Sequence, residues 1–224
     1  MNRFRLIIDP PRESAINMAT DHAIMHGISI SESMPTIRFY RWRRPSVTLG
    51  YFQKIAECVN TVYCRENGIS VTRRETGGGT VLHYKELTYS FTVPVNSGIV
   101  TAGVEDSFKQ IISPIINSLN RFSVRAEYRP VNDIVINNRK ISGSAQLRKK
   151  GVIQQHGTII IDMDNELVRS ALIHDEKKLK ARGFVSMDES ITSVKNETGT
   201  EINDEFIEKI ILSLIQNFSK SFNA

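Results

Sequence analysis

The chain has 224 residues, with 29 lysines and arginines against 24 aspartates and glutamates, so its formal net charge is +5. Hydrophobic residues make up 40% of it and charged residues 24%, as in ordinary globular proteins. Two cysteines exclude a disulfide framework, the amino terminus lacks a secretory signal, and every apolar run is too short to span a membrane. We therefore expect a cytoplasmic globular protein.

The first third of the chain alternates strand and helix patterns. Ser14 offers an amino-terminal cap to the first helix, and Gly27 offers a residue at which that helix can end. A second helix is expected to stop at Gly68. The expected elements are, in chain order, a strand over 4–9, a helix from Ser14 to Gly27, strands over 36–42 and 45–52, a helix over 54–67 and a strand over 69–73.

Strands dominate the chain from a glycine-rich loop as far as residue 162. An unbroken apolar stripe predicts a helix over 104–120, and Pro114 inside it predicts a kink or an early break. Asn137 and Asn138 tolerate positive φ, which predicts a tight hairpin. The further expected elements are strands from near Thr80 and over 86–93, 124–128, 133–136, 139–145 and 152–162, a weakly helical segment over 164–182, and a final helix capped by Asn203.

Strands with interspersed helices and hairpin-like pairs predict an α+β fold with a mixed, largely antiparallel β-sheet flanked by helices. No linker rich in proline, glycine or serine divides the chain, so we expect one domain over residues 1–224. The net positive charge suits an anionic nucleotide, an acidic protein or a nucleic acid, and it does not choose among them.

Three consecutive glycines, Gly77, Gly78 and Gly79, lie between two predicted strands. A glycine gives up side-chain packing and costs backbone entropy, so three together are expected where another group must lie against the backbone. Arg73 and Arg74 precede the loop and carry side chains suited to phosphate or carboxylate. The stretch predicts an anion site or, as the plainer alternative, a surface turn with solvated arginines.

A second stretch, residues 131–162, centres on a lysine inside a predicted strand. Small residues leave space for the ammonium of Lys140 in a cavity, where it can hold an anionic or carbonyl oxygen. These small neighbours are Ser142, Gly143, Ser144 and Ala145. The alternative is a lysine on the solvent face of a hairpin, and His156 in the next strand is equally compatible with a packed histidine.

Together the two stretches read R-R-x-x-G-G-G-x-V-x-H, then N-D-x-x-x-x-x-x-K-x-S-G-S-A, then H-G-T. This pattern resembles the lipoate–protein ligase A and octanoyltransferase family, which shares its catalytic fold with the biotin protein ligases. The resemblance covers nearly all of the chain, from F-Y-R-W at 39–42 to K-K-L-K-A-R-G-F at 177–184. It implies a biotin/lipoate protein ligase-like catalytic domain, related in fold to the class II aminoacyl-tRNA synthetases.

The resemblance implies that the matching residues bind an acyl-adenylate made from lipoate and ATP. Lys140 would be the catalytic residue and would contact the carbonyl or bridging oxygen of the activated acyl group. Asn132 and Asp133 would face the adenylate, with Asp133 beside any Mg²⁺, and Arg74 would lie near the phosphate. The other expected binding residues are Gly77, Gly78 and Gly79 in the loop, Val81, His83 and Trp42 along the acyl tunnel, and Ser142, Gly143, Ser144, Ala145, His156 and Thr158 around the lysine.

In the ligases that this chain resembles, the nucleophile is a lysine of an acidic acceptor lipoyl domain. That domain belongs to a 2-oxoacid dehydrogenase E2 subunit or to the glycine cleavage H protein. Some relatives instead move an octanoyl group from acyl carrier protein through an enzyme cysteine, but no cysteine follows Tyr89 here. The sequence therefore favours a lipoate–protein ligase that acts through lipoyl-adenylate, with neither a nucleic acid nor a membrane as a partner.

Two features favour other functions. The segments E-L-T-Y-S at 86–90 and G-Y-F-Q at 50–53 resemble the cysteine-dependent transferases. The chain ends at Ala224, where full-length ligases continue into an accessory domain, so the resemblance implies a separate accessory subunit. The alternatives are an octanoyl or lipoyl transferase that uses acyl carrier protein or another lipoylated protein as donor, and a non-catalytic binder of lipoyl domains.

Overall fold

The computed structural model describes residues 2–173 and 184–223, and its strands form two β-sheets. The strands are β1 (Arg5–Ile8), β2 (Thr36–Tyr40), β3 (Ser46–Leu49), β4 (Ser70–Arg73), β5 (Val81–His83), β6 (Glu86–Pro94), β7 (Glu127–Arg129), β8 (Asp133–Ile136), β9 (Arg139–Lys149) and β10 (Val152–Ile160). In this part of the chain the larger sheet has the order β1-β2-β6-β10-β9-β8-β7 and the smaller one β4-β3-β5. The pairs β1–β2 and β3–β4 are parallel, and the other described ladders are antiparallel.

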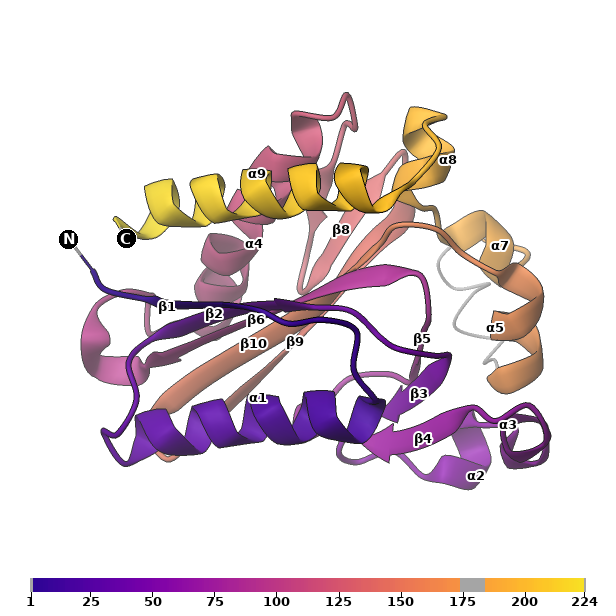
Figure 1. Ribbon diagram of the computed structural model, residues 1–224, viewed down its shortest axis with the longest axis horizontal. Helices are drawn as coiled ribbons and strands as arrows, with labels where there is room; N and C mark the ends of the chain where they lie inside the picture. Colours follow the sequence, from indigo (N-terminus) through magenta and orange to yellow (C-terminus); the bar gives the residue numbers. More distant parts are fainter. Residues whose placement is uncertain (1, 174–183, 224) are drawn as a thin grey trace.

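Helices cover both faces of the larger sheet (Figure 1). On one face lies α1 (Ser14–Ser29), and on the other lie α4 (Val104–Asn120) and α9 (Asp204–Phe222). The shorter helices are α2 (Ile55–Cys58), α3 (Thr61–Glu66), α5 (Asn165–Ala171), α7 (Met187–Ser190) and α8 (Val194–Thr198), with a 3₁₀ turn over Val95–Ser97. This arrangement confirms the predicted α+β fold with a mixed, largely antiparallel sheet flanked by helices.

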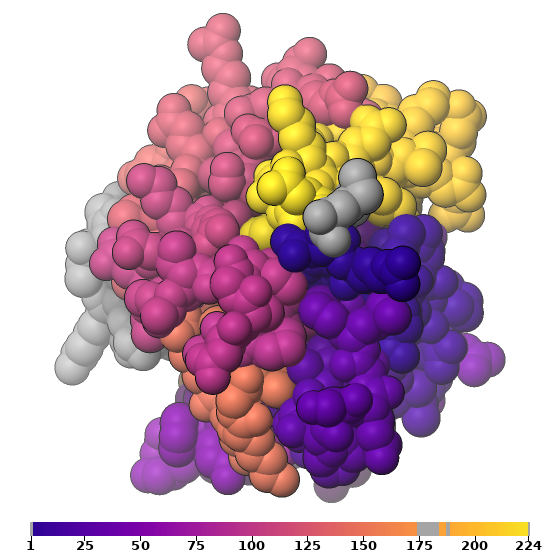
Figure 2. Space-filling view, turned by 90° about the vertical axis from the view of Figure 1, so that its left-hand side faces the viewer, coloured from indigo at the N-terminus to yellow at the C-terminus, as the bar shows by residue number. Residues whose placement is uncertain are grey.

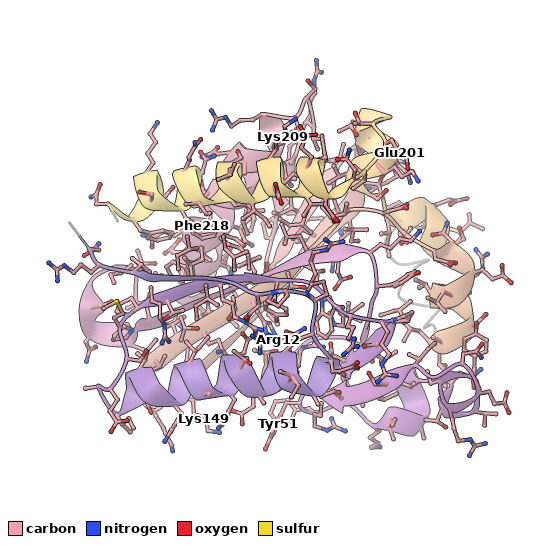
Figure 3. All side chains as sticks on the ribbon, in the orientation of Figure 1. Arg12, Tyr51, Lys149, Glu201, Lys209 and Phe218 are labelled. Carbon is pink, nitrogen blue, oxygen red and sulfur yellow. The ribbon has the colours of Figure 1, made fainter. Side chains whose placement is uncertain are left out.

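The main apolar core fills the space between the larger sheet and the helices α4 and α9. Phe218 points from α9 toward the sheet (Figure 3), and its ring centroid lies 5.8 Å from that of Phe91 and 6.2 Å from that of Tyr89. Asn203 caps α9 as predicted, because its side chain accepts a hydrogen bond from the amide of Phe206 at 2.9 Å. Burial of this aromatic face holds the last helix against the sheet.

The amino-terminal strand lies beside the carboxyl-terminal helix (Figure 2). The amide of Asn2 donates to the carbonyl of Asn223 at 2.7 Å, and the side-chain amide of Asn2 donates to the carbonyl of Phe222, also at 2.7 Å. The first and last described segments therefore hold each other in place. No helix in the described part of the chain combines the length and the apolar character needed to cross a membrane.

Two predicted helix boundaries are wrong at the start of the chain. Glu13, not Ser14, is the cap residue of α1, because the hydroxyl of Ser14 lies within 2.9 Å of Ser70 Oγ and 2.7 Å of Thr72 Oγ1 on β4. The helix also passes Gly27 and ends at Ser29. Ile28 is buried in an apolar cluster with two other residues of the same helix, so packing carries the helix beyond the glycine.

The helix expected over 54–67 is interrupted. Val59 is extended and forms a β-bridge with Leu172, which separates α2 from α3. Asn60 then caps α3 by accepting a hydrogen bond from the amide of Tyr63 at 3.1 Å. The apolar pattern of the sequence runs through Val59 without a gap, because Val59 is buried in the apolar cluster of the smaller sheet. The pattern therefore did not reveal that the helix is interrupted there.

Three other expectations differ from the structure. The helix α4 continues through Pro114 without a break, because its apolar face is buried against the sheet and outweighs the one missing hydrogen bond. The strand expected over 124–128 is β7, displaced toward the carboxyl terminus. The helical segment expected over 164–182 is α5, and residues 174–183, which include most of K-K-L-K-A-R-G-F, lie outside the described residues.

Candidate functional site

A cavity of about 240 Å³ lies between the two sheets, with Met18 of α1 in its wall. It brings together most of the site residues that the sequence suggested. Those that line it are Trp42, Arg74, Gly78, Gly79, Val81, His83, Asn132, Lys140, Gly143, Ser144, Ala145, His156 and Thr158. Gly77, Asp133 and Ser142 are outside the lining, and Ser142 is fully buried.

The hairpin of β8 and β9 places Lys140 in the cavity wall. Asn137 and Asn138 have φ angles of 49° and 64°, which confirms the predicted tight turn. The turn sets the two strands in a register that brings Lys140 Nζ to 2.7 Å from Asp133 Oδ1. The alternative of a lysine on the solvent face is therefore wrong.

Asp133 lies between two cations. Its Oδ2 accepts a hydrogen bond from Arg129 Nη2 at 2.9 Å, while Oδ1 faces Lys140. Burial raises the pKa of Asp133, but the ammonium of Lys140 and the guanidinium of Arg129 outweigh it and hold that pKa below its usual value. The carboxylate is therefore ionised at neutral pH, and it fixes the ammonium at the cavity wall.

The sequence resemblance predicted Mg²⁺ beside Asp133. In this structure both carboxylate oxygens face cations, and the described residues hold no cluster of three or more histidine, cysteine, aspartate or glutamate side chains. Mg²⁺ is usually held by one or two carboxylates together with substrate phosphates, so Asp133 would contribute one ligand and the nucleotide the others. Mg²⁺ at this carboxylate stays a prediction.

Gly143 leaves the space that the lysine side chain occupies. A Cβ at this position would lie 2.4 Å from Lys140 Nζ and 2.5 Å from its Cε. We expect Gly143→Ala to displace the ammonium. The variant should lower the rate of the acyl transfer expected from the sequence about as much as Lys140→Ala does, with little change in the melting temperature. Comparing the activity and thermal unfolding of Gly143→Ala with those of Lys140→Ala checks this. Full activity of Gly143→Ala would contradict this prediction.

Arg74 is bound to the glycine loop and is not solvated. Its Nη2 donates to the carbonyls of Gly77 at 2.8 Å and Gly79 at 2.6 Å. Burial lowers the pKa of Arg74 to about 10, so the guanidinium stays charged at neutral pH. The plain alternative of a surface turn with solvated arginines is thus wrong for Arg74, which is 6% exposed. In this structure its hydrogen-bond donors hold the loop.

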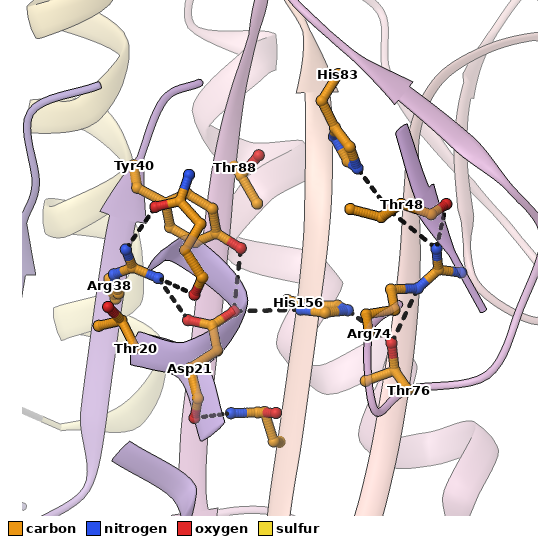
Figure 4. Close-up of polar contacts among 12 residues, drawn as sticks. Thr20, Asp21, Arg38, Tyr40, Thr48, Arg74, Thr76, His83, Thr88 and His156 are labelled. Carbon is orange, nitrogen blue, oxygen red and sulfur yellow. Dashed lines mark hydrogen bonds and ion pairs between the residues drawn. The ribbon is translucent and has the colours of Figure 1, made fainter. Parts of the chain in front are cut away.

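Two chains of hydrogen bonds run from Arg74 to buried carboxylates, and Figure 4 shows the first as far as Asp21 and the second as far as His83. In the first, Nε donates to Thr76 Oγ1 at 3.1 Å, and this hydroxyl lies 2.7 Å from His156 Nε2. The other ring nitrogen, Nδ1, lies 3.3 Å from Asp21 Oδ2. Burial lowers the pKa of His156, so the ring is neutral. The consistent assignment is that Thr76 donates to Nε2 and that Nδ1–H donates to Asp21.

The second chain has the same order of groups. Arg74 Nη1 donates to Thr48 Oγ1 at 3.1 Å, and this hydroxyl lies 2.7 Å from His83 Nε2. His83 Nδ1 in turn bonds to Glu86 Oε1. Thus each side of the guanidinium is connected through a threonine and a histidine to an acid. Both histidines were expected to touch the substrate, but their ring nitrogens are engaged within the protein.

Beyond the first chain, Asp21 belongs to a buried charge network. Arg38, which is fully buried, donates to Asp21 Oδ1 and to Asp9 Oδ2, each at 2.7 Å. Tyr40 donates to the other oxygen of Asp21 at 3.0 Å. Burial raises the pKa of Asp21, but His156 and Arg38 outweigh it and hold that pKa below its usual value. A fixed carboxylate therefore anchors the end of the chain.

The stacked rings of Trp42 and His83 form one apolar wall of the cavity. Their centroids are 3.8 Å apart with an interplanar angle of 13°, and Trp42 Nε1 donates to Thr88 Oγ1 at 2.9 Å. The indole and imidazole are therefore locked in place. A flat, fixed apolar wall suits a linear acyl chain.

Several residues of the site were not predicted as site residues from the sequence. Thr48, Thr76, Asp21 and Glu86 meet around Arg74 and the two histidines, although they come from four separate segments. A lone threonine or a buried acid has no periodic pattern. The spatial meeting of strands from two sheets was needed to find them.

Comparisons with known proteins show the family of the whole chain. The lipoyl protein ligase A/B catalytic domain family matches residues 13–218. The octanoyltransferase LipM of Clostridioides difficile is 32% identical over 246 residues, which cover 99% of this chain and 89% of that protein.

Two solved structures resemble the whole chain. A bi-partite lipoate protein ligase of Thermoplasma acidophilum, studied with its E2 lipoyl domain, has a TM-score of 0.83 and 27% identity, covering 100% of this chain and 85% of that one. A lipoate-protein ligase A bound with ATP has a TM-score of 0.79 and 26% identity, with coverages of 99% and 85%. In fold and in sequence, the chain belongs to the lipoyl protein ligase A/B catalytic domain family.

Proposed function

We propose that this protein is a lipoate–protein ligase catalytic subunit, which transfers a lipoyl group from lipoyl-adenylate to a lysine of an acceptor lipoyl domain. The observation that carries the proposal is the ammonium of Lys140 in the wall of a cavity that Gly78 and Gly79 also line. Apolar side chains also line the cavity, among them Val81 and Trp42, and they suit the acyl chain. The acceptor is expected to be the lipoyl domain of a 2-oxoacid dehydrogenase E2 subunit or the H protein.

In the proposed step the acceptor amine attacks the acyl carbonyl carbon. A carbon–nitrogen bond forms, the carbon–oxygen bond to the phosphate breaks so that AMP leaves as the phosphate anion, and the proton of the amine passes to water. Negative charge develops on the carbonyl and leaving oxygens. Lys140 Nζ, fixed by Asp133 at 2.7 Å, supplies a preorganised positive charge for these oxygens. The glycine loop holds the donor in place, so orientation and charge account for the rate.

The cysteines support a route without a covalent acyl-enzyme. Cys64 is buried, its thiol lies 3.8 Å from the carbonyl of Ala171, and burial raises its pKa. Cys58 accepts a hydrogen bond from Gln53 Nε2 at 3.1 Å and, like Cys64, is outside the cavity lining. A thiolate nucleophile needs a lowered pKa and access to the acyl group. Cys64 meets neither condition, and Cys58 lacks access because it lies outside the cavity lining.

A second candidate is an octanoyl or lipoyl transferase, because a relative with 32% identity over nearly the whole chain is named octanoyltransferase LipM. Its donor would be octanoyl acyl carrier protein or another lipoylated protein. The acceptor amine would then displace the donor's thiol or amine directly, again beside Lys140. This candidate shares the site and differs in the donor.

The purified protein should be given an apo lipoyl domain and three donors in separate reactions: lipoate with Mg·ATP, preformed lipoyl-adenylate, and octanoyl acyl carrier protein without ATP. We expect a modified domain with lipoyl-adenylate, detected by intact mass. Modification from lipoate and ATP that requires an added candidate accessory subunit would assign adenylate formation to that subunit. If only octanoyl acyl carrier protein gives a modified domain, the protein is a transferase and the proposal of a ligase is wrong. Failure with all three donors would leave only a non-catalytic binder of lipoyl domains.

A further inference from the structure

The turn formed by residues 50–54, which we call the aromatic turn, presents two large aromatic side chains to solvent. Phe52 is 86% exposed and Tyr51 is 53% exposed. Their rings meet edge to face, with centroids 5.0 Å apart and an interplanar angle of 85°. Isolated apolar side chains are common on protein surfaces, but a paired set held on a rigid element is typical of an anchor for a protein partner.

Arg73 makes the aromatic turn rigid. Its Nη1 donates to the carbonyl oxygens of Gly50 and Tyr51, each at 2.9 Å, and of Gln53 at 2.8 Å. The side chain of Gln53 also accepts from the amide of Gly50 at 2.9 Å. The arginine that the sequence suggested for an anion thus fixes the backbone below Phe52. An exposed aromatic ring on a fixed backbone loses little entropy when a partner covers it.

The aromatic turn is built directly against the glycine loop. The amide of Tyr51 donates to the carbonyl of Thr76 at 2.9 Å, and the hydroxyl of Thr80 donates to Gln53 Oε1 at 2.9 Å. Between these two contacts, Gly50 packs so closely that an added Cβ would lie 2.1 Å from the carbonyl oxygen of Gly78. A protein bound to the aromatic turn would therefore lie next to the loop that lines the proposed site.

We propose that the aromatic turn is the docking surface for the acceptor lipoyl domain, with Phe52 as its main anchor. This inference rests on the proposed function, because that function requires a protein acceptor whose lysine must reach the cavity beside the glycine loop. The inference adds which surface of this protein the acceptor domain contacts.

Charge near the loop complements an acidic acceptor. Lys149 lies 3.4 Å from Glu75, which directly precedes Thr76, and the exposed Lys150 follows it at the tip of the hairpin between β9 and β10. Figure 3 shows Tyr51 and Lys149 on the same edge of the molecule. Two ammonium groups against one carboxylate leave net positive charge on this edge of the molecule, which favours encounter with an acidic domain.

The test measures the rate of domain modification at saturating acyl donor while the concentration of apo lipoyl domain is varied. We expect Phe52→Ala to raise the KM for the domain about 10-fold or more, the effect of removing a main anchor. Arg73→Gln, which frees the turn but keeps Phe52, is expected to raise the KM as well. Leu212→Ala is the matched control, because Leu212 is 59% exposed on α9, on the other face of the sheet.

A small acceptor separates docking from damage to the glycine loop. With hydroxylamine in place of the domain and the same donor, Phe52→Ala is expected to react at the wild-type rate. An unchanged KM for the domain would overturn the proposal. An equal loss with hydroxylamine would overturn it too, since the variant would then act through the loop.

A binding measurement keeps this test independent of the proposed function. If the wild-type protein modifies no domain with any donor, the proposed function fails, and ¹⁵N-labelled apo lipoyl domain is titrated with the wild type and with Phe52→Ala. Shifts in the domain's amide signals that occur with the wild type and disappear with the variant would support docking on the aromatic turn. An absence of shifts with the wild type, or equal shifts with both proteins, would overturn it.

Discussion

Lys140→Ala is expected to lower kcat for acyl transfer about 10²- to 10³-fold, with a much smaller change in the KM for the donor. The reason is that the ammonium stabilises oxygen atoms whose negative charge grows in the transition state, and removing one such group typically has an effect of this size. Its charge is fixed in place, because Nζ lies 2.7 Å from Asp133. Single-turnover transfer from purified lipoyl-adenylate measures this step without the activation of the acid.

Two controls accompany Lys140→Ala. Lys209→Ala removes an equally charged side chain from α9, where Lys209 pairs with Glu205, and it should leave kcat unchanged. Thermal unfolding of Lys140→Ala should stay close to that of the wild type, because Asp133 keeps Arg129 as a partner at 2.9 Å. If Lys140→Ala transfers the acyl group as fast as the wild type, the mechanism fails for the ligase and for the transferase alike.

The second large effect is expected from the threonines that connect Arg74 to the two histidines. Thr76→Val and Thr48→Val replace a buried hydroxyl by a methyl group of similar volume, and each leaves a nitrogen of Arg74 and of a histidine with one partner fewer. A buried polar group without its partner costs about 1–3 kcal/mol, which corresponds to about a 5- to 150-fold change in kcat/KM. We expect the loss chiefly in the KM for the donor, since Arg74 holds the carbonyls of the glycine loop.

The conservative variants Thr76→Ser and Thr48→Ser keep the hydroxyl and should restore most of the activity. The valine variants should have a lower melting temperature in either case, and a merely structural role would leave the KM for the donor unchanged. Because burial holds the pKa of His156 below its usual value, its ring stays neutral through neutral pH and becomes protonated only in acid. The first chain should therefore be intact at neutral pH, and the KM for the donor should rise as the pH falls through that lowered pKa.

Local patterns in the sequence identified much of the site. The glycines at 77–79, the lysine at 140 and the asparagine turn at 137–138 each have a local physical signature, and Gly78, Gly79 and Lys140 line one cavity. The strands were found because β-branched and aromatic residues alternate along them, and the helices α4 and α9 because their apolar faces recur with the helical period. These features depend on neighbours in the chain and can be predicted from it.

The interruption at Val59 and the helix that continues past Gly27 depend on packing between distant segments, which local propensity does not contain.

The roles of the two arginines also depend on contacts between distant segments. The sequence by itself determined that Arg73 and Arg74 stand beside a loop of glycines, and it suggested an anion for both. Only the tertiary structure decided that Arg73 fixes the aromatic turn and that Arg74 holds the glycine loop. The physical reason is that a guanidinium binds whichever acceptors the fold brings within reach, and here these are backbone carbonyls and threonine hydroxyls from other strands and turns.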